Sequence, residues 1–356
     1  MTEAEILFET RGPLGLVTLN RPKALNALTL GMAEQMLARL GEWMGDPAIQ
    51  AVVVRGAGDR AFCAGGDVRA VWDAGSAQQR GPGSPTDLFF RTEYRLNRRI
   101  HRFPKPYVAL IDGITMGGGV GLSVHGSHRV ATERTLFAMP ETGIGLFPDV
   151  GGSYFLNRCP GATGTWMALT GARLGAGDLC HARIASHVVA SAALDTLVEE
   201  LAGARWSGHP AAVVEEVLSR HHAAPPPAAI PQHRATIDRC FSGDTVEGIL
   251  ACLDADSDPW AAEQAAILRR MSPTSLKVTL AQLRRAADLP FDDCMVMEFR
   301  MSQACMAGHD FYEGIRALLV DKDKNPKWSP ATLEAVDAAL VERHFAPLGA
   351  HDLSFA

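Results

Sequence analysis

Short apolar runs recur along the N-terminal part of the chain and predict strands. The run at 6–22, ILFETRGPLGLVTLNRP, has β-type residues on both sides of a Gly-Pro pair and predicts a hairpin. The runs AVVVRGAG (51–58) and PYVALIDG (106–113) are short, almost wholly apolar and closed by glycine, as expected of buried strands. The segment at 128–141, HRVATERTLFAMPE, predicts two further short strands.

Amphipathic segments lie between these runs and predict helices. The segment at 28–46 places apolar residues at helical spacing on one face. The segment at 86–103 does the same, and Thr86 or Asp87 is suited to cap its first turn. Because strands and helices alternate, we expect an α/β architecture built on buried parallel strands.

A proline-rich stretch, HAAPPPAAIPQ (222–232), interrupts this pattern and predicts a stiff connector. The sequence after it is mostly helical in pattern, over 245–255, 259–271, 275–289, 295–308, 311–321 and 329–345. We therefore predict two regions, an α/β core over 1–215 that holds the functional site and a helical C-terminal region over 216–356.

Bulk composition removes several classes of protein. The 356 residues are 47% hydrophobic, enough for a sizeable core, and the net charge of −6 gives no electrostatic case for nucleic-acid binding. Seven scattered cysteines without CxxC spacing predict reduced, mostly buried thiols instead of a disulfide framework or a zinc site. The longest apolar run (106–124) is broken by Asp112 and by glycines, so we expect no membrane span. The acidic start MTEAEILFET lacks targeting features, which predicts a cytoplasmic protein.

Several segments resemble known motifs, but the sequence around each does not fit the function of that motif. GAGDRA (56–61) loosely fits a dinucleotide-binding fingerprint, but no clear helix follows it and position 76 is serine where an acid is expected. The spacing around Ser123 does not form a serine-hydrolase elbow. His125 and His128 lie three residues apart without a nearby acid or cysteine, so we interpret them as structural histidines.

Two glycine clusters and one acidic segment carry the chemistry. FCAGGD (62–67) and MGGGVG (116–121) each follow a predicted strand, and both fit either a tight turn or a loop whose N–H groups face a ligand. Two such loops facing one point would form an oxyanion hole. MPETGIGLFPD (139–149) holds Glu141 and Asp149 in apolar surroundings, where carboxylates are costly unless they are paired or used.

Taken together, these motifs resemble those of the crotonase (enoyl-CoA hydratase/isomerase) superfamily, and within it they are most similar to the 3-hydroxyisobutyryl-CoA hydrolase subfamily. The resemblance rests on LNRPKALNA (19–27), AFCAGGD (61–67), DGITMGGGVG (112–121), MPETGIGLFPDVGG (139–152) and FYEGIRALLVDKDKNPKWSPATLEAV (311–336). It implies a crotonase-like spiral of strand–strand–helix repeats with a helical C-terminal region. It also implies an acyl-CoA thioester as substrate.

The resemblance assigns roles to individual residues. The amides of Gly66 and Gly118 match the family's oxyanion hole, and Glu141 matches its catalytic glutamate. Asp149 and Glu93 match carboxylates of the hydrolase pattern. In that pattern Glu141 acts as a nucleophile or as a general base towards water, and Asp149 and Glu93 orient the water or bind the substrate hydroxyl.

Further expectations follow from the same resemblance. Lys23 and the region of Arg60 lie in motifs that approach CoA in the family. No metal or redox cofactor is required, since coenzyme A is part of the substrate. The resemblance leaves room for a homo-oligomer formed through the C-terminal helices, with valine breakdown as the pathway if the substrate is correct.

One departure from the family pattern bears on the reaction. Hydratases of the superfamily carry a second glutamate at the position of Gly121, which has no side chain here. Two-glutamate hydration is therefore disfavoured, whereas an enoyl-CoA isomerase that uses one glutamate at Glu141 remains an alternative. A non-catalytic acyl-CoA-binding protein on the same fold is the alternative from another class.

Overall fold

The computed structural model describes residues 4–355, which group into two compact units. The first unit comprises the described residues up to Gly66 together with Arg95–Ala138 and Arg173–Ala229. The second comprises Asp67–Tyr94, Met139–Ala172 and the chain from Ile230 onwards. This grouping differs from the predicted division at residue 215, because two segments of the predicted core group with the C-terminal helices. The transition from Ala229 to Ile230 lies inside the predicted proline-rich connector (222–232), whose last three residues are the first of a helix.

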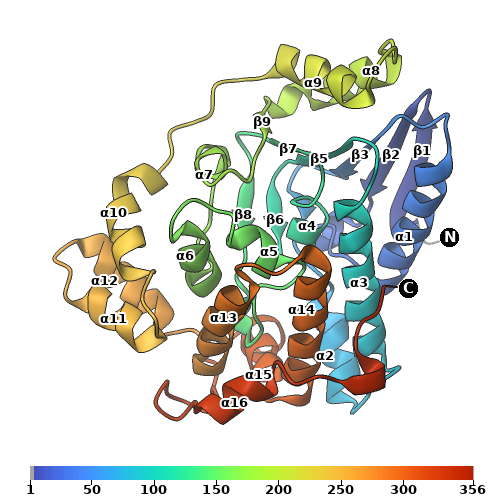
Figure 1. Ribbon diagram of the computed structural model, residues 1–356. Coiled ribbons are helices and arrows are strands. Elements are labelled where there is room, and N and C mark those ends of the chain that lie inside the picture. Colours follow the sequence, from blue (N-terminus) through green and yellow to red (C-terminus); the bar gives the residue numbers. More distant parts are fainter. Residues whose placement is uncertain (1–3, 356) are drawn as a thin grey trace. The chain divides into compact units, whose positions relative to one another are not determined.

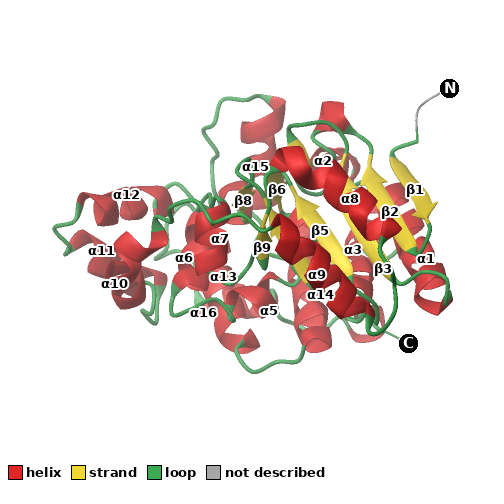
Figure 2. Cartoon of the chain, turned by 90° about the horizontal axis from the view of Figure 1, so that it is seen from above, coloured by secondary structure: helices red, strands yellow, loops and turns green. Residues whose placement is uncertain are grey.

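The first unit is built on a six-stranded sheet with the order β1-β2-β3-β5-β7-β9, seen as yellow arrows side by side in Figure 2. The strands are β1 (Ile6–Arg11), β2 (Leu14–Leu19), β3 (Ala51–Gly56), β5 (Tyr107–Ile111), β7 (His128–Ala131) and β9 (His187–Val188). β1 and β2 form the predicted antiparallel hairpin, and every later pairing in the sheet is parallel. The apolar runs thus form the buried parallel strands that their composition predicted.

A second, three-stranded parallel sheet has the order β4-β6-β8. Its strands are β4 (Ala61–Cys63), β6 (Ile114–Met116) and β8 (Leu136–Ala138). They follow directly after β3, β5 and β7 of the large sheet, so that three successive turns of the chain each contribute one strand to each sheet. This is the spiral of strand–strand–helix repeats that the sequence predicted.

Helices of the first unit cover both faces of the large sheet. They are α1 (Leu30–Gly45), α4 (Gly118–Gly121), α7 (Ala176–His181), α8 (Leu194–Gly203) and α9 (Pro210–His221), with short turns at Pro22–Ala24 and Ser191–Ala193. Alternate strand residues pack with α8 and α9 in one apolar core that includes Leu16, Val53, Val108, Leu197 and Leu218. On the opposite face, Trp43 of α1 packs against Gly15, where a Cβ atom would come within 2.8 Å of the ring.

The helix α3 (Pro85–His101) contributes residues to both units and begins one residue before the predicted start. The hydroxyl of Ser84 accepts a hydrogen bond from the Asp87 amide at 3.2 Å, and Pro85 occupies the first helical position. Ser84 therefore caps the helix, and the prediction of Thr86 or Asp87 was wrong. Proline is well suited to the first position because its missing N–H would have no intrahelical partner.

The second unit is helical apart from its connections (Figure 1). It contains α2 (Val68–Ser76), α5 (Gly152–Leu156), α6 (Thr163–Thr170), α10 (Ile230–Cys240), α11 (Val246–Asp254), α12 (Pro259–Leu268), α13 (Pro273–Ala286), α14 (Phe291–Ala307), α15 (Asp310–Ile315) and α16 (Ala338–Arg343), with short turns η2 (Glu141–Ile144), η4 (Arg316–Val320) and η5 (Gly349–His351). Five of the six helices predicted in this region are present. The sixth, at 329–345, is helical only over α16.

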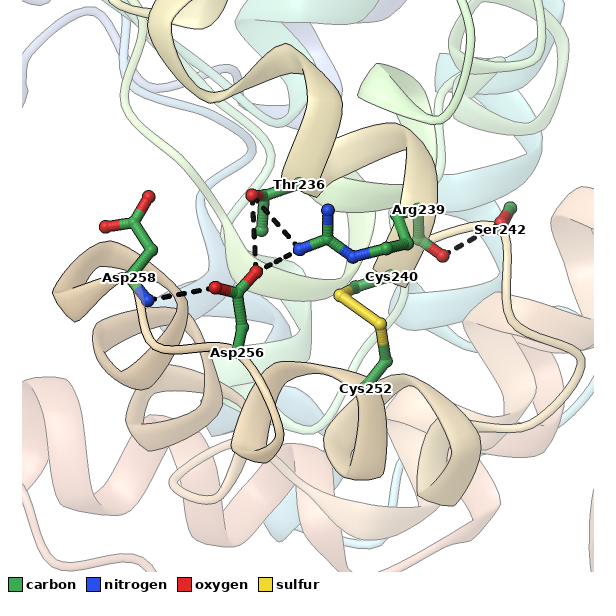
Figure 3. Close-up of a disulfide and its surroundings, with 7 residues drawn as sticks. All are labelled: Thr236, Arg239, Cys240, Ser242, Cys252, Asp256 and Asp258. Carbon is green, nitrogen blue, oxygen red and sulfur yellow. Dashed lines mark hydrogen bonds and ion pairs between the residues drawn. A yellow bond between two sulfur atoms is a disulfide. The ribbon is translucent and has the colours of Figure 1, made fainter.

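Cys240 of α10 and Cys252 of α11 form a disulfide, which Figure 3 shows beside the ion pair of Arg239 and Asp256. The prediction of reduced thiols was wrong for this pair. Cys252 lies twelve positions after Cys240, and only the packing of one helix on the next brings the two together. The other five are not disulfide-bonded; all are buried except Cys180, which is half-buried.

Candidate active site

Two glycine-rich loops of the first unit lie side by side. The loop after β4 is held to the segment before α1, where the Leu28 amide donates to the Gly65 carbonyl at 2.8 Å. A Cβ atom on Gly65 would lie 3.5 Å from the Met116 carbonyl oxygen and 4.0 Å from the Gly118 nitrogen. The structure therefore brings the loops of Gly66 and Gly118 together, as the oxyanion-hole interpretation requires.

The glycine run of the second loop has a steric cause. Gly118 is the first residue of α4, and a Cβ atom on the next residue, Gly119, would clash with the carbonyl oxygen of Cys63. Only glycine allows α4 to start so close to β4. Among the hydrogen bonds of residues 4–355, neither the Gly66 nor the Gly118 amide donates to a protein acceptor. Both N–H groups are thus available to a ligand.

Lys23 lies in the exposed turn Pro22–Ala24 of the same unit, and Arg60 is exposed in the segment before β4. Their exposure suits a role in binding phosphate groups. No contact in the structure assigns that role, which stays a prediction.

Three carboxyl groups gather in the second unit. Glu93 comes from α3, Glu141 is the first residue of η2, and Asp149 lies in the turn that precedes α5. Each of the three residues is no more than 4% exposed. Neither Oε1 of Glu93 nor Oε2 of Glu141 has a hydrogen-bond partner among residues 4–355. Buried acceptors without partners are uncommon in cores and are typical of sites that bind or transform a ligand.

The electrostatics of this carboxylate cluster favour protonation. Burial raises the pKa of Asp149 from 3.8 to about 7, although a hydrogen bond from Tyr94 opposes the shift. Burial raises the pKa of Glu93 and of Glu141 well above the ordinary value, and the nearby charge of Asp149 adds to both shifts. Such a cluster shares its protons, so near neutral pH it can offer an acid and a base together.

The sequence did not reveal two further residues of this cluster, Tyr94 and Glu298. The hydroxyl of Tyr94 donates to Oδ2 of Asp149 at 2.9 Å, and burial raises the pKa of Tyr94 so that the hydroxyl keeps its proton. Glu298 of α14 is fully buried, and burial raises its pKa to about 8. Glu298 lies in the apolar middle of α14 and could have been found for the same reason as Glu141 and Asp149, because an acid in apolar surroundings is costly unless it is paired or used.

Asp149→Asn is expected to stabilise the protein at alkaline pH. Native Asp149 keeps its proton up to a pKa of about 7, while the unfolded state releases it near 3.8. The native state therefore binds more protons between these values, and stability falls as pH rises through that window. In thermal melts the midpoint of the variant should exceed that of the wild type by more at pH 8 than at pH 5, because pH 5 lies only partway through that window. Equal differences at the two pH values would contradict the raised pKa.

Residues 4–355 contain no group of three or more histidine, cysteine or acidic side chains arranged to hold a metal ion. Within the same residues, no helix is long and apolar enough to cross a membrane.

A comparison with protein families shows which family the chain belongs to. Residues 14–345 match the family model described as enoyl-CoA hydratase/isomerase. The chain belongs to this family. The resemblance and the crotonase-like fold predicted from the sequence are thereby confirmed.

Individual relatives are similar over nearly the whole chain. The mitochondrial 3-hydroxyisobutyryl-CoA hydrolase of Mus musculus is 50% identical over 99% of this chain and 91% of its own length. The enzyme of the same name from Homo sapiens is 48% identical with the same coverage. A solved structure named as a carnitinyl-CoA dehydratase from Mycobacterium thermoresistibile is 44% identical, with a TM-score of 0.91 over 99% of this chain and 98% of its own.

These relatives overturn one prediction. The cytoplasmic location was inferred from the acidic first residues, yet the names of the mouse and human relatives place those enzymes in mitochondria. The prediction was wrong because the composition of a short N-terminal stretch says little about where an enzyme works.

Proposed function

We propose that this enzyme hydrolyses 3-hydroxyisobutyryl-CoA to 3-hydroxyisobutyrate and CoA, a step of valine breakdown. The observation that carries the proposal is the buried cluster of Glu93, Glu141 and Asp149, because it supplies the three carboxylates of the hydrolase pattern. The names of the mouse and human relatives support the same substrate.

The oxyanion forms where water or a carboxylate adds to the thioester carbonyl. In the proposed reaction the amides of Gly66 and Gly118 donate to this oxygen as its charge develops. Loss of one such donor typically costs about 3 kcal/mol of transition-state stabilisation. Since both donors belong to the backbone, their position depends on the close approach of α4 and β4, which Gly119 permits.

Glu141 is the proposed attacking group or base. As a nucleophile it displaces the CoA thiolate and forms a mixed anhydride that water then cleaves. As a general base it removes a proton from the attacking water. Both routes need an ionised carboxylate whose oxygen is not committed elsewhere, and Oε2 of Glu141 has no partner among the described residues.

Asp149 and Glu93 are proposed to orient the water and to bind the 3-hydroxyl group of the acyl chain. Because the charge of Asp149 raises the pKa of Glu93 and Glu141, the proton shared by the cluster can be passed to the departing thiolate. We further propose that the reaction needs no metal or redox cofactor, since these amides and carboxylates supply its acid, base and oxyanion stabilisation.

The solved relative named as a carnitinyl-CoA dehydratase raises hydration or dehydration as the rival reaction. That chemistry uses a second glutamate at the position of Gly121, which lies in α4 and offers no side chain. An isomerase could act with Glu141 alone but would have no use for Asp149 and Glu93, whose burial without a function is costly.

A thiol-release assay over a panel of short acyl-CoA esters tests the proposal. We expect the largest kcat/KM for 3-hydroxyisobutyryl-CoA and lower values for 3-hydroxypropionyl-CoA and for esters without the 3-hydroxyl group. Hydration of an enoyl-CoA or a double-bond shift, without thiol release from any ester of the panel, would overturn it.

A further inference from the structure

The turn that carries Asp149 is held on both sides by side chains from two C-terminal helices. On one side, Nε2 of Gln282 in α13 donates to the Pro148 carbonyl oxygen at 2.8 Å. On the other side, Glu298 of α14 accepts the amides of Gly151 and Ser153. The backbone is therefore held at Pro148 before Asp149, and at Gly151 and Ser153 after it.

Glu298 makes the larger share of these contacts. Its Oε2 accepts the Gly151 amide at 2.7 Å, and its Oε1 accepts the Ser153 amide at 2.9 Å. The hydroxyl of Ser153 also donates to Oε1, and the side chain of Gln282 approaches the same oxygen at 3.5 Å. When Glu298 is ionised these hydrogen bonds are charge-assisted, and such bonds are stronger than those between neutral groups.

The backbone held in this way is strained. Val150 has a φ of +51° and Gly151 a φ of +84°, so two successive residues lie in the left-handed region. A β-branched residue is seldom found there, because its Cβ substituents crowd the neighbouring carbonyl groups. Such a conformation persists only when its surroundings impose it, and strained residues of this kind cluster at functional sites. The two bonds from Glu298 to Gly151 and Ser153 supply that constraint.

Burying an acid to hold this turn is energetically costly. Glu298 is fully buried, and burial raises its pKa to about 8, although the hydrogen bonds from Ser153 and Gly151 oppose the shift. A glutamine would avoid the charge, but its amide group would point a donor at the Gly151 or the Ser153 amide. Only a carboxylate presents acceptors to both. The two oxygens of Glu298 thus match the two amides, of Gly151 and Ser153, that this turn presents.

We propose that Glu298, supported by Gln282, is a positioning residue that fixes the carboxylate of Asp149 for the attack on the thioester. This inference rests on the proposed hydrolase function. Glu298 acts through the backbone of residues 150–153, while Tyr94 fixes the other end of the Asp149 side chain. Neither Glu298 nor Gln282 needs to touch the substrate.

Glu298→Gln tests the proposal, because it keeps the size of the side chain and removes one acceptor. A displacement of a catalytic group by about 1 Å can reduce the rate roughly 100-fold. We expect kcat for thiol release to fall about 10- to 100-fold while the Kd for the acyl-CoA stays within about threefold. Amide exchange over residues 149–156 should accelerate in the same variant.

A double-mutant cycle separates positioning from general loss of structure. If Glu298 acts through Asp149, the variant with both Asp149→Asn and Glu298→Gln should be no slower than Asp149→Asn alone. If the losses in kcat multiply instead, or if Glu298→Gln keeps a kcat within about threefold of wild type, Glu298 is an anchor for folding only and the proposal is overturned.

Asp310 provides the matched control. It is also a buried carboxylate that accepts a backbone amide and a hydroxyl, from Ser329 and Ser272, but it holds a different segment. Asp310→Asn should lower the melting temperature and leave kcat within about threefold.

If wild-type enzyme released no thiol from any ester, the hydrolase function would fail by itself. Amide exchange over residues 149–156 in Glu298→Gln would then still test the constraint on the turn.

Discussion

Replacing Glu141 by glutamine is expected to abolish CoA release from 3-hydroxyisobutyryl-CoA. Glutamine has nearly the same shape but can neither add to a carbonyl carbon nor take a proton from water, so it blocks both proposed routes. Loss of a positioned base typically lowers a rate by about 10²- to 10⁴-fold, and we expect at least 10³-fold here. Thiol release, followed at saturating substrate, measures the effect.

Loss of fold is not expected to explain that result. Glu141 is buried, and its pKa is raised well above the ordinary value, so the native state holds its charge at a cost that glutamine removes. The variant should bind the acyl-CoA and melt no lower than wild type at pH 8. Glu247→Gln makes the same chemical change at the surface of α11 and should leave kcat unchanged. Wild-type turnover by Glu141→Gln would exclude Glu141 from the chemistry.

The fold could be predicted largely because its strands are buried and short. In β3 and β5 the apolar residues run without interruption, and glycine ends or soon follows each strand, so the pattern was sufficient. The helix predicted over 329–345 was mostly wrong, since apolar spacing alone does not show that residues 329–337 pack outside a helix. The grouping into units depends on long-range contacts, such as that of Gly145 with Asp310, which no local pattern contains.

The candidate site was predicted unevenly. Glu141 and Asp149 were found because carboxylates in an apolar segment require a reason, and the glycine loops because two clusters each followed a strand. Glu93 lies in an ordinary amphipathic helix, α3, and was assigned only by resemblance. Tyr94 was missed because a buried tyrosine is usually part of a core, and its bond to Asp149 crosses 55 residues of sequence.

The disulfide shows the same limit. Cys240 and Cys252 meet because α10 packs on α11, and their separation of twelve residues resembles no disulfide or metal motif. A bond that depends on how two helices pack becomes visible only in three dimensions.

Asp149→Asn is expected to lose hydrolysis and to keep acyl-CoA binding. Asparagine can still accept the hydrogen bond from Tyr94, so the side chain should keep its place. It cannot carry the charge that orients and polarises water beside Glu141, and we expect kcat to fall about 10²- to 10³-fold. Thiol release and calorimetric titration with a thioether analogue of the substrate measure the two properties separately.

The stability of this variant makes the result decisive. The raised pKa of Asp149 means that its charge destabilises the native state above pH 7, so Asp149→Asn should be more stable and yet inactive at pH 8. Inactivity with a higher melting temperature cannot arise from unfolding, and it assigns the charge itself to the reaction. Glu93→Gln serves as the comparison within the cluster and should weaken binding of the 3-hydroxy ester more than that of an ester without the hydroxyl group. If Asp149→Asn loses acyl-CoA binding together with turnover, Asp149 holds the substrate instead of the water, and the attack must then depend on Glu141 alone.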